Sequence, residues 1–464
     1  MSEKETLNLI QTKQLMQIAE TLINAGYLLP PESDSTINEK EDVRSQLKTD
    51  EKGRVYQSNE NCQLILRIDT LFKNAIRFNE LSSMIDICKD LGWKRESPNF
   101  CDTDLDNIIT YMETHYGISA EKKIERAVRI IAKENSYHPL RDKLLNLKWD
   151  GISRISNALH HFLGADKSIL VAESLKVFML GAVSRIFNPG CKFELMLCLV
   201  GGQGAGKSTF LRFLAMNDLF FTDDIKKLDD KVFEHIRGHW IIEIPEMIAI
   251  LNAKMVEETK SFVSRQYDNY RTPFDKYAVD HPRQCVFAGT SNKTQFLPMD
   301  KSGNRRFLPI EVNSDNAECH ILDDEEASRS YIEQLWAEIM TIYLSGKYSL
   351  TLTKELQKDL LSAQEKHCPE DPMETAIRNY LDEFHPEYVC VKMLYQNAFN
   401  HSEEDTPAQW ESNAISEIME QKMTDYRKIS THRFQKYGTQ RAWVLVKDSE
   451  FRELTDDDKE NCPF

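Results

Sequence analysis

The sequence is poor in the features that mark membrane, secreted and zinc-binding proteins. No stretch of its 464 residues approaches the ~20 consecutive apolar residues of a membrane-spanning helix. The first residues, MSEKETLNLIQ, lack the apolar centre of a signal peptide. The 10 cysteines have neither C-x-x-C nor Cys/His zinc spacing, so we interpret them as reduced thiols. We therefore expect a cytoplasmic protein with no membrane partner.

A uniformly basic surface is also absent, because the formal net charge is −16. Any binding of nucleic acid would have to come from local basic elements in a groove or channel. The chain has no internal repeat and no low-complexity tract, and its length is enough for about three domains.

One segment that is present predicts a specific chemistry. An apolar run at 195–200 leads directly into the pattern G-x-x-x-x-G-K-S. Such a loop points backbone N–H groups at nucleotide phosphates, and the helix after it adds its positive end. We expect Lys207 to reach the β- and γ-phosphates and the Ser208 hydroxyl to bind Mg²⁺. The predicted nucleotide-binding residues are Gly201, Gly202, Gln203, Gly204, Ala205, Gly206, Lys207, Ser208 and Thr209.

Apolar runs alternate with helical patterns after this loop, which predicts an α/β fold with a mainly parallel sheet and helices on both faces. The expected strands are 195–200, 219–222, 239–244, 284–289 and 306–312. Residues 60–148 are expected to be mostly helical. Beyond 372 we expect helices 373–384, 393–400 and 408–423, a strand at 388–392, and a strand pair around 436–439.

Two acids mark the end of the predicted strand 239–244. A carboxylate at such a position can hold Mg²⁺ through water and polarise the attacking water. We assign Glu243 to the metal and Glu246 to the base, with the reversed roles as the alternative. Either acid could instead be a solvent-exposed residue at a strand end.

Polar residues at two later positions would complete an ATPase site. Asn292, after the strand 284–289, can sense the γ-phosphate and orient water, or it can simply cap a turn. Arg305 and Arg306 suit action on the γ-phosphate of a neighbouring subunit, or they form a surface ion pair.

Residues 264–277 alternate aromatic and basic side chains around a proline-centred turn, which predicts a hairpin. Aromatic faces stack on bases and cations meet phosphates, so the hairpin suits single-stranded nucleic acid. The candidate contacts are Tyr270, Arg271, Phe274 and Lys276. The alternative is a solvated hairpin whose aromatics pack beneath it.

Together these segments resemble the virulence-associated protein E family, among the superfamily III-like AAA+ helicases of phages and mobile genetic islands. The resemblance runs from about 60 to 315. The matching segments are Tyr137–Pro139, Trp149–Gly151, Pro189–Phe193, the phosphate loop, Trp240–Glu246, Lys260–Phe262, Tyr270–Pro273, Pro282–Gln284, Gly289–Asn292 and Gly303–Phe307.

The resemblance implies a P-loop AAA+ ATPase that uses ATP and Mg²⁺ and forms a ring, usually a hexamer, with its sites between subunits. It makes Lys207 and Ser208 the Walker A residues, Glu243 and Glu246 the Walker B acids, Asn292 sensor 1, Arg305 or Arg306 the arginine finger, and the 267–277 hairpin the DNA-contacting element. The Walker B acids depart from the AAA+ pattern, because Ile244 and Pro245 separate them.

The C-terminal unit resembles the winged helix of plasmid and island replication initiators. Its basic residues are Arg427, Lys428, Arg433, Lys436 and Arg441, with 437–441 as the wing. The second helix would enter the major groove while the wing contacts the backbone. The alternative is a solvated basic surface, because the preceding helix is acidic.

We therefore expect a helix and polar linker at 1–56, a helical domain at 57–150, the ATPase domain at 151–365, a winged helix at 370–450 and an acidic tail at 451–464. The expected function is an ATP-driven DNA helicase and replication initiator of a mobile genetic element, translocating on single-stranded DNA and recognising double-stranded origin DNA. The alternatives are a DNA-sensing ATPase switch or phage-interference protein without unwinding, and a regulator that uses ATP only to oligomerise.

Two further patterns are not assigned to catalysis. The acids at 102, 104 and 106 suggest a two-carboxylate polymerase motif, but capping of a helix at 106–115 explains them better. His160 and His161 have no partner constellation in the sequence, and we interpret them as a helix end.

Overall fold

The computed structural model describes residues 43–225, 232–245, 253–272, 277–297, 301–369 and 371–446. The chain divides into two units, Met1–His367 and Cys368–Phe464. Three predicted site residues, Glu246, Phe274 and Lys276, lie outside the described residues, as do the predicted N-terminal helix and the acidic tail. In the described ranges, no helix combines the length and apolarity needed to cross a membrane.

A five-stranded parallel sheet forms the centre of the first unit, as the alternating pattern predicts. Its order is β4 (Phe221–Thr222), β5 (Ile241–Ile244), β8 (Val286–Ser291), β3 (Met196–Val200) and β9 (Phe307–Glu311), and each neighbouring pair is parallel. All residues of β3, β5 and β8 are buried. Burial on both faces explains why these strands appear in the sequence as continuous apolar runs.

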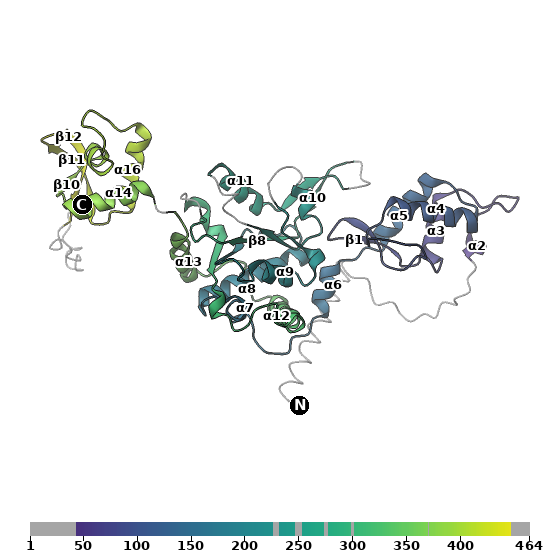
Figure 1. Cartoon of the computed structure of the whole chain (residues 1–464). Helices are drawn as coiled ribbons and strands as arrows, with labels where there is room; N and C mark the ends of the chain where they lie inside the picture. Colours follow the sequence, from purple (N-terminus) through teal and green to yellow (C-terminus); the bar gives the residue numbers. More distant parts are fainter. Residues whose placement is uncertain are drawn as a thin grey trace, which may run out of the picture. The chain divides into compact units, whose positions relative to one another are not determined.

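Helices cover both faces of this sheet. Figure 1 shows α8 (Ile169–Phe187), α9 (Lys207–Leu214) and α12 (Glu325–Leu344) below it, and α10 (Val232–Ile236) and α11 (Ala253–Ser264) above it. The rings of Trp240 and Trp336 lie 4.4 Å apart, and the Trp336 indole donates to the Leu214 carbonyl. This part of the chain also contains the helices α6 (Pro139–Asn146), α7 (Ala158–Leu163) and α13 (Lys354–Lys366). The layered core holds the ends of the strands in fixed positions.

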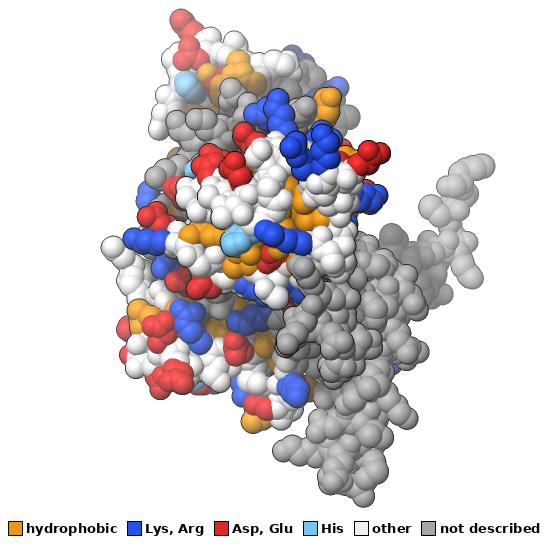
Figure 2. All heavy atoms as spheres, turned by 90° about the vertical axis from the view of Figure 1, so that its right-hand side faces the viewer, with side chains coloured by type: hydrophobic (Ala, Val, Ile, Leu, Met, Phe, Trp, Pro, Cys, Tyr) orange, Lys and Arg blue, Asp and Glu red, His pale blue; other side chains and the backbone are white. Residues whose placement is uncertain are grey.

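The N-terminal part, expected to be mostly helical, also contains a short strand pair that was not expected. Alongside α2 (Val43–Gln46), α3 (Asn59–Ile68), α4 (Asp102–Tyr116) and α5 (Glu121–Glu134), it contains an antiparallel pair, β1 (Ile76–Asn79) and β2 (Met84–Ile87). Strands of four residues carry too few apolar positions to be told from one turn of helix. On the face turned to the viewer in Figure 2, Lys and Arg side chains are interspersed with Asp and Glu.

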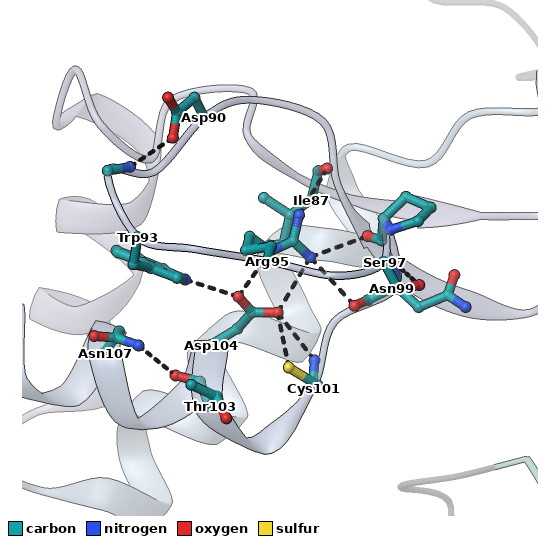
Figure 3. Close-up of polar contacts among 12 residues, drawn as sticks. Ile87, Asp90, Trp93, Arg95, Ser97, Asn99, Cys101, Thr103, Asp104 and Asn107 are labelled. Atoms are coloured by element: carbon teal, nitrogen blue, oxygen red, sulfur yellow. Dashed lines mark hydrogen bonds and ion pairs between the residues drawn. The ribbon is translucent and has the colours of Figure 1, made fainter.

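The carboxylate motif at 102–106 forms a helix cap. Asp104 is 1% exposed and lies in the first turn of α4, which begins at Asp102 rather than at 106. Figure 3 shows its carboxylate accepting hydrogen bonds from Arg95 Nε (2.8 Å), Trp93 Nε1 (2.8 Å) and the Cys101 N–H (3.1 Å). Burial raises the pKa of Asp104, but these bonds outweigh burial and lower it. The group is therefore held ionised for a structural purpose.

The second unit has its own small core around Ile377, Leu394, Ile415 and Trp443. Its elements are α14 (Pro372–Phe384), β10 (Tyr388–Val389), α15 (Val391–Ala398), α16 (Gln409–Gln421), β11 (Tyr426–Phe434) and β12 (Gly438–Leu445). The strands form an antiparallel sheet in the order β10-β12-β11. The expected order of helices and strands is confirmed. The expected strand 388–392 is shorter because α15 begins at Val391.

Candidate active site

The loop between β3 and α9 has the backbone geometry that its glycines predict. Gly204 and Gly206 have φ angles of 83° and 79°, in the left-handed region that favours glycine. A Cβ at Gly201 would lie 2.3 Å from the carbonyl oxygen of Val312, so no side chain fits there. α9 begins at Lys207, with Gly206 as its N-cap. The loop therefore opens directly into the N-terminus of a helix.

Lys207 and Asn292, 85 residues apart in the sequence, meet at this loop. Lys207 Nζ donates to the carbonyl oxygens of Gly201 (2.7 Å) and Gly202 (2.7 Å) and to Asn292 Oδ1 (3.0 Å). The contact follows from the topology, because β3 and β8 are parallel neighbours and both residues come after the ends of these strands. The lysine ammonium is thus held at the mouth of the loop, next to the amide predicted to sense the γ-phosphate.

Ser208 and Glu243 also meet, as predicted for a metal site. Glu243 is 1% exposed, and its Oε1 accepts from Ser208 Oγ (2.7 Å) and Thr290 Oγ1 (2.6 Å). Its Oε2 is buried and has no hydrogen-bond partner among the residues that the structure describes. Burial raises the pKa of Glu243, while the hydrogen bonds from Thr290 and Ser208 lower it, and burial prevails.

This set of oxygens fits Mg²⁺, which binds proteins through one or two carboxylates and completes its shell with water and phosphate. The unpartnered Oε2 of Glu243 is an acceptor that a cation or its water would satisfy. Thr290 was quoted in the sequence pattern without a role. Glu243 lies opposite Ala288, and Thr290 is two residues further along the same strand, so it shares a face with Glu243. The register of the two strands is the signal that could have identified it.

Arg305 and Arg306 lie at the opposite edge of the sheet. They end the 3-10 helix Lys301–Arg306, directly before β9, and Phe307 pairs with Met196 at the start of β3. The phosphate loop follows the end of β3, and a strand of five residues spans about 17 Å. Neither arginine is therefore placed to reach the phosphate loop of its own chain.

The two arginines differ in how they are held. Arg306 Nε donates to Ser264 Oγ (2.9 Å) and lies 3.3 Å from Glu194 Oε2, and its side chain is 17% exposed. Arg305 is 69% exposed and lies 3.8 Å from Glu194 Oε1. Surface pairs of this kind are weak, so Arg305 is available to another molecule, whereas Arg306 is a structural residue. The sequence alone did not distinguish them.

The predicted hairpin is present, but one of its aromatics is packed against the protein. β6 (Tyr267–Tyr270) pairs with β7 (Val279–Pro282) in an antiparallel arrangement. The Tyr270 ring stacks on His281 (4.0 Å) and on Phe233 (6.0 Å), and burial raises its pKa to about 12. For Tyr270 the structure thus favours packing over stacking on bases. Arg271 is exposed, as is Tyr277, which the sequence reasoning did not select.

A buried ion pair fixes the base of this hairpin. Arg283 is 2% exposed and donates from Nε to Asp268 Oδ2 (2.8 Å), with further bonds to Asp268 Oδ1 and the Phe262 carbonyl. Its guanidinium lies 4.6 Å from the Phe262 ring, on α11. A bidentate, fully satisfied pair of this kind joins the hairpin to α11 beside the five-stranded sheet.

The five basic candidates of the second unit all lie outside its helices. Arg427, Lys428 and Arg433 are on β11, Arg441 is on β12, and Lys436 is in the turn between them. Lys428 pairs with Glu420 and Lys436 pairs with Glu403. The three arginines are exposed, with no ion pair to another described residue. The positive charge of these candidates is thus partly neutralised within the chain.

The part of the chain that contains this site is similar to known proteins. The family described as virulence-associated protein E-like domain matches residues 144–369, which include every candidate residue from Gly201 to Arg306. The phosphate import ATP-binding protein PstB 1 of Lactobacillus johnsonii is 36% identical over 78 residues, 16% of this chain. The chain spans about a quarter (27%) of that relative.

Two solved structures of the NrS-1 C-terminal region, both described as an A form without ligand, also match. Each covers 80% of this chain and 96% of its own, with a TM-score of 0.44 and sequence identities of 14% and 13%.

Proposed function

Because residues 144–369 belong to the virulence-associated protein E-like domain family, we propose that the chain is an ATP-driven DNA helicase that initiates replication of a mobile genetic element. Its first unit would be a P-loop AAA+ ATPase and its second a winged helix. Similarity to an ATP-binding protein over 78 residues supports ATP as the nucleotide. The protein would work in the cytoplasm as a ring, usually a hexamer.

One observation carries this proposal: the candidate catalytic residues are divided between the two edges of one sheet. Lys207, Asn292 and Glu243 converge at the ends of β3, β8 and β5. Arg305 lies just before β9, is exposed, and is separated from its own phosphate loop by the length of β3. An arginine that contributes 10³–10⁵-fold to phosphoryl transfer can be supplied by a neighbouring molecule. A ring places one subunit's Arg305 against the next subunit's loop.

Within the site, each residue has a distinct task. The loop N–H groups and Lys207 would bind the β- and γ-phosphates, so Lys207 would exchange its carbonyl partners for phosphate oxygens. Asn292 would orient the attacking water, and Glu246 would accept its proton. Ser208 and Glu243 would hold Mg²⁺, which neutralises charge on the phosphates when bound. Thr290 would keep the Glu243 carboxylate turned toward Ser208.

DNA would be contacted by two elements. The 267–277 hairpin, fixed by Arg283 and Asp268, would follow single-stranded DNA through Arg271 and the exposed Tyr277. The second unit has the element order of a winged helix, in which β11, β12 and the turn between them form the wing. Its exposed arginines, Arg427, Arg433 and Arg441, would contact the phosphates of origin DNA while α16 enters the major groove.

The test is unwinding of a forked duplex by the full chain with ATP and Mg²⁺, measured beside ATP turnover with and without single-stranded DNA. We expect DNA-stimulated turnover and strand separation, both lost in Lys207→Ala. Stimulated turnover without strand separation would favour the DNA-sensing switch. An absence of turnover in an assembled ring would favour the regulator that uses ATP only to oligomerise.

A further inference from the structure

A group of residues from two separate segments lies beside the phosphate loop, and the proposed function gives these residues no role. A Cβ built at Gly206 would lie 3.6 Å from His320 Nε2, 3.6 Å from Ile321 Cγ2 and 3.7 Å from Leu163 Cδ2. Leu163 ends α7, and the other two belong to the segment that follows β9. We call α7 and residues 313–323 together the flanking wall. It adjoins Gly206, the N-cap of α9, at the end of the phosphate loop.

The flanking wall is firmly built. Three backbone bonds join its halves, from Asn313 N to Leu163 O (3.0 Å) and from Glu318 N and Cys319 N to His161 O (3.0 and 3.1 Å). At Gly164 a Cβ would lie 1.9 Å from the Asn313 carbonyl oxygen, so the halves approach as closely as glycine allows. The wall is thus a fixed surface against which a ligand can be positioned.

Glu318 joins the halves through side chains as well. Its carboxylate accepts from His161 Nδ1 (2.7 Å), Lys167 Nζ (3.1 Å) and Asn157 Nδ2 (3.2 Å). These bonds, that from His161 first, lower the pKa of Glu318 to about 2. The carboxylate therefore stays ionised and holds the segment that carries His320 against α7.

The histidines of the wall do not form a separate reactive centre. Cys319 Sγ lies 3.3 Å from His161 Nε2, which suggests a nucleophile beside a base. However, burial, together with Asp323 and Glu318, raises the pKa of the Cys319 thiol, which disfavours the thiolate. Among the residues that the structure describes, no group of three or more His, Cys, Asp or Glu could hold a metal ion. The cluster is better explained as support for His320.

The His320 ring is oriented by its own backbone neighbours. Its Nδ1 accepts a hydrogen bond from the Leu322 N–H (3.2 Å), and the His320 N–H donates to Asp323 Oδ2 (2.8 Å). With Nδ1 acting as acceptor, the neutral ring carries its proton on Nε2. The Nε2 donor faces Gly206 and has no hydrogen-bond partner among the described residues. Leu322, two residues on, leaves 53% of its apolar side chain exposed.

The position of the Lys207 ammonium indicates which end of a bound nucleotide would lie near the flanking wall. Lys207 Nζ is turned back toward Gly201, Gly202 and Asn292, so the terminal phosphates belong on that side. Resting on the proposed function, we propose that the flanking wall is the nucleoside-binding side of the ATP site, where His320 Nε2–H donates a hydrogen bond to the nucleoside and Leu322 offers an apolar surface to the base.

The test separates the nucleoside from the phosphates. A fluorescent ATP analogue bound to the full chain is displaced either by ATP or by inorganic triphosphate. We expect His320→Ala to lower the affinity for ATP about 10-fold, because the loss of one hydrogen bond costs about 1.4 kcal/mol. The affinity for triphosphate should not change. In turnover assays KM rises while kcat changes little. His320→Gln, which restores an N–H donor, should recover most of the affinity, and His115→Ala on α4 is the matched control.

The outcomes distinguish this inference from the proposed function. If His320→Ala weakened ATP and triphosphate equally, or weakened neither, the inference would be wrong while a functional phosphate loop remained. If the unaltered chain bound neither ligand, the proposed function itself would fail. Lys207→Ala is the control for the assay. If this variant, and not His320→Ala, loses triphosphate binding, the displacement of the analogue measures binding at the phosphate loop.

Discussion

The two edges of the five-stranded sheet differ in how their polar side chains are satisfied. At the carboxyl edge, Lys207, Asn292, Ser208, Thr290 and Glu243 bond to one another and to the loop, and one carboxylate oxygen is left buried and unpartnered. At the amino edge, Arg306 is held by Ser264 and Glu194, while Arg305 is largely exposed. The first edge has the features expected of a ligand site, and the second leaves a cation exposed.

In the proposed ring, this difference would make one chain supply halves of two different sites. A buried oxygen without a partner destabilises the fold by about 1–3 kcal/mol, so its presence points to a ligand that completes it. An exposed guanidinium has no such cost and gains most where it meets an anion away from water. The proposed ring would bring the carboxyl edge of one copy to the amino edge of another.

The largest expected effect is at the carboxyl edge. Lys207→Ala removes the ammonium that would neutralise the terminal phosphates, and we expect ATP turnover to fall by more than about 10³-fold. Steady-state phosphate release measures this. Lys293→Ala, which removes an exposed lysine just after the neighbouring strand β8, is the matched control and should keep normal turnover. Appreciable turnover in Lys207→Ala would contradict the assignment of the loop.

At the amino edge, Arg305→Ala should lower kcat by about 10³-fold without loss of ATP binding, because the finger acts on the transition state. Arg306→Ala is the contrasting variant. It leaves Glu194 and Ser264 without their half-buried cation, so it should lower the midpoint of thermal unfolding, whereas Arg305→Ala should not. Single-turnover kinetics, nucleotide binding and calorimetry measure the three effects.

Mixing the variants tests whether the edges meet between subunits. Lys207→Ala and Arg305→Ala chains are each inactive, but a mixed ring contains some interfaces with an intact loop and an intact arginine. We expect partial recovery of turnover on mixing. A mixture as inactive as its components, in rings shown to exchange subunits, would mean that Arg305 does not act on a neighbour.

The comparison also shows what the sequence could determine. Gly201–Ser208 and the parallel strands were predictable, because loop chemistry and apolar runs are local patterns. The meeting of Lys207 with Asn292 followed from neighbouring strand ends. The distinct states of Arg305 and Arg306 were not predictable, because they depend on Glu194 and Ser264, which are distant in sequence and carry no motif. The strands β1 and β2 were not predictable either, because four residues are too few to show an alternating apolar pattern. Nor was the packing of Tyr270 on His281.

Thr290 offers the smallest and most specific test of the carboxyl edge. Its hydroxyl donates to Glu243 Oε1 and so favours the ionised carboxylate, against a burial that raises the pKa of Glu243. Thr290→Val keeps the side-chain shape but removes this bond, which should raise the pKa of Glu243 further. Because the site needs the carboxylate, the acid limb of kcat/KM should move to higher pH, since the ionised fraction at any pH falls.

The loss of turnover should therefore be about 10-fold on the acid limb and shrink as the pH rises, since a charge-assisted hydrogen bond is worth about 1.5–3 kcal/mol. Ser291→Ala, which removes a hydroxyl bonded to the Lys293 backbone and not to Glu243, is the matched control and should leave the limb in place. A uniform loss at every pH in Thr290→Val would mean that Thr290 shapes the strand rather than the charge of Glu243. Thr290 would then have a structural role, as Arg306 has at the amino edge.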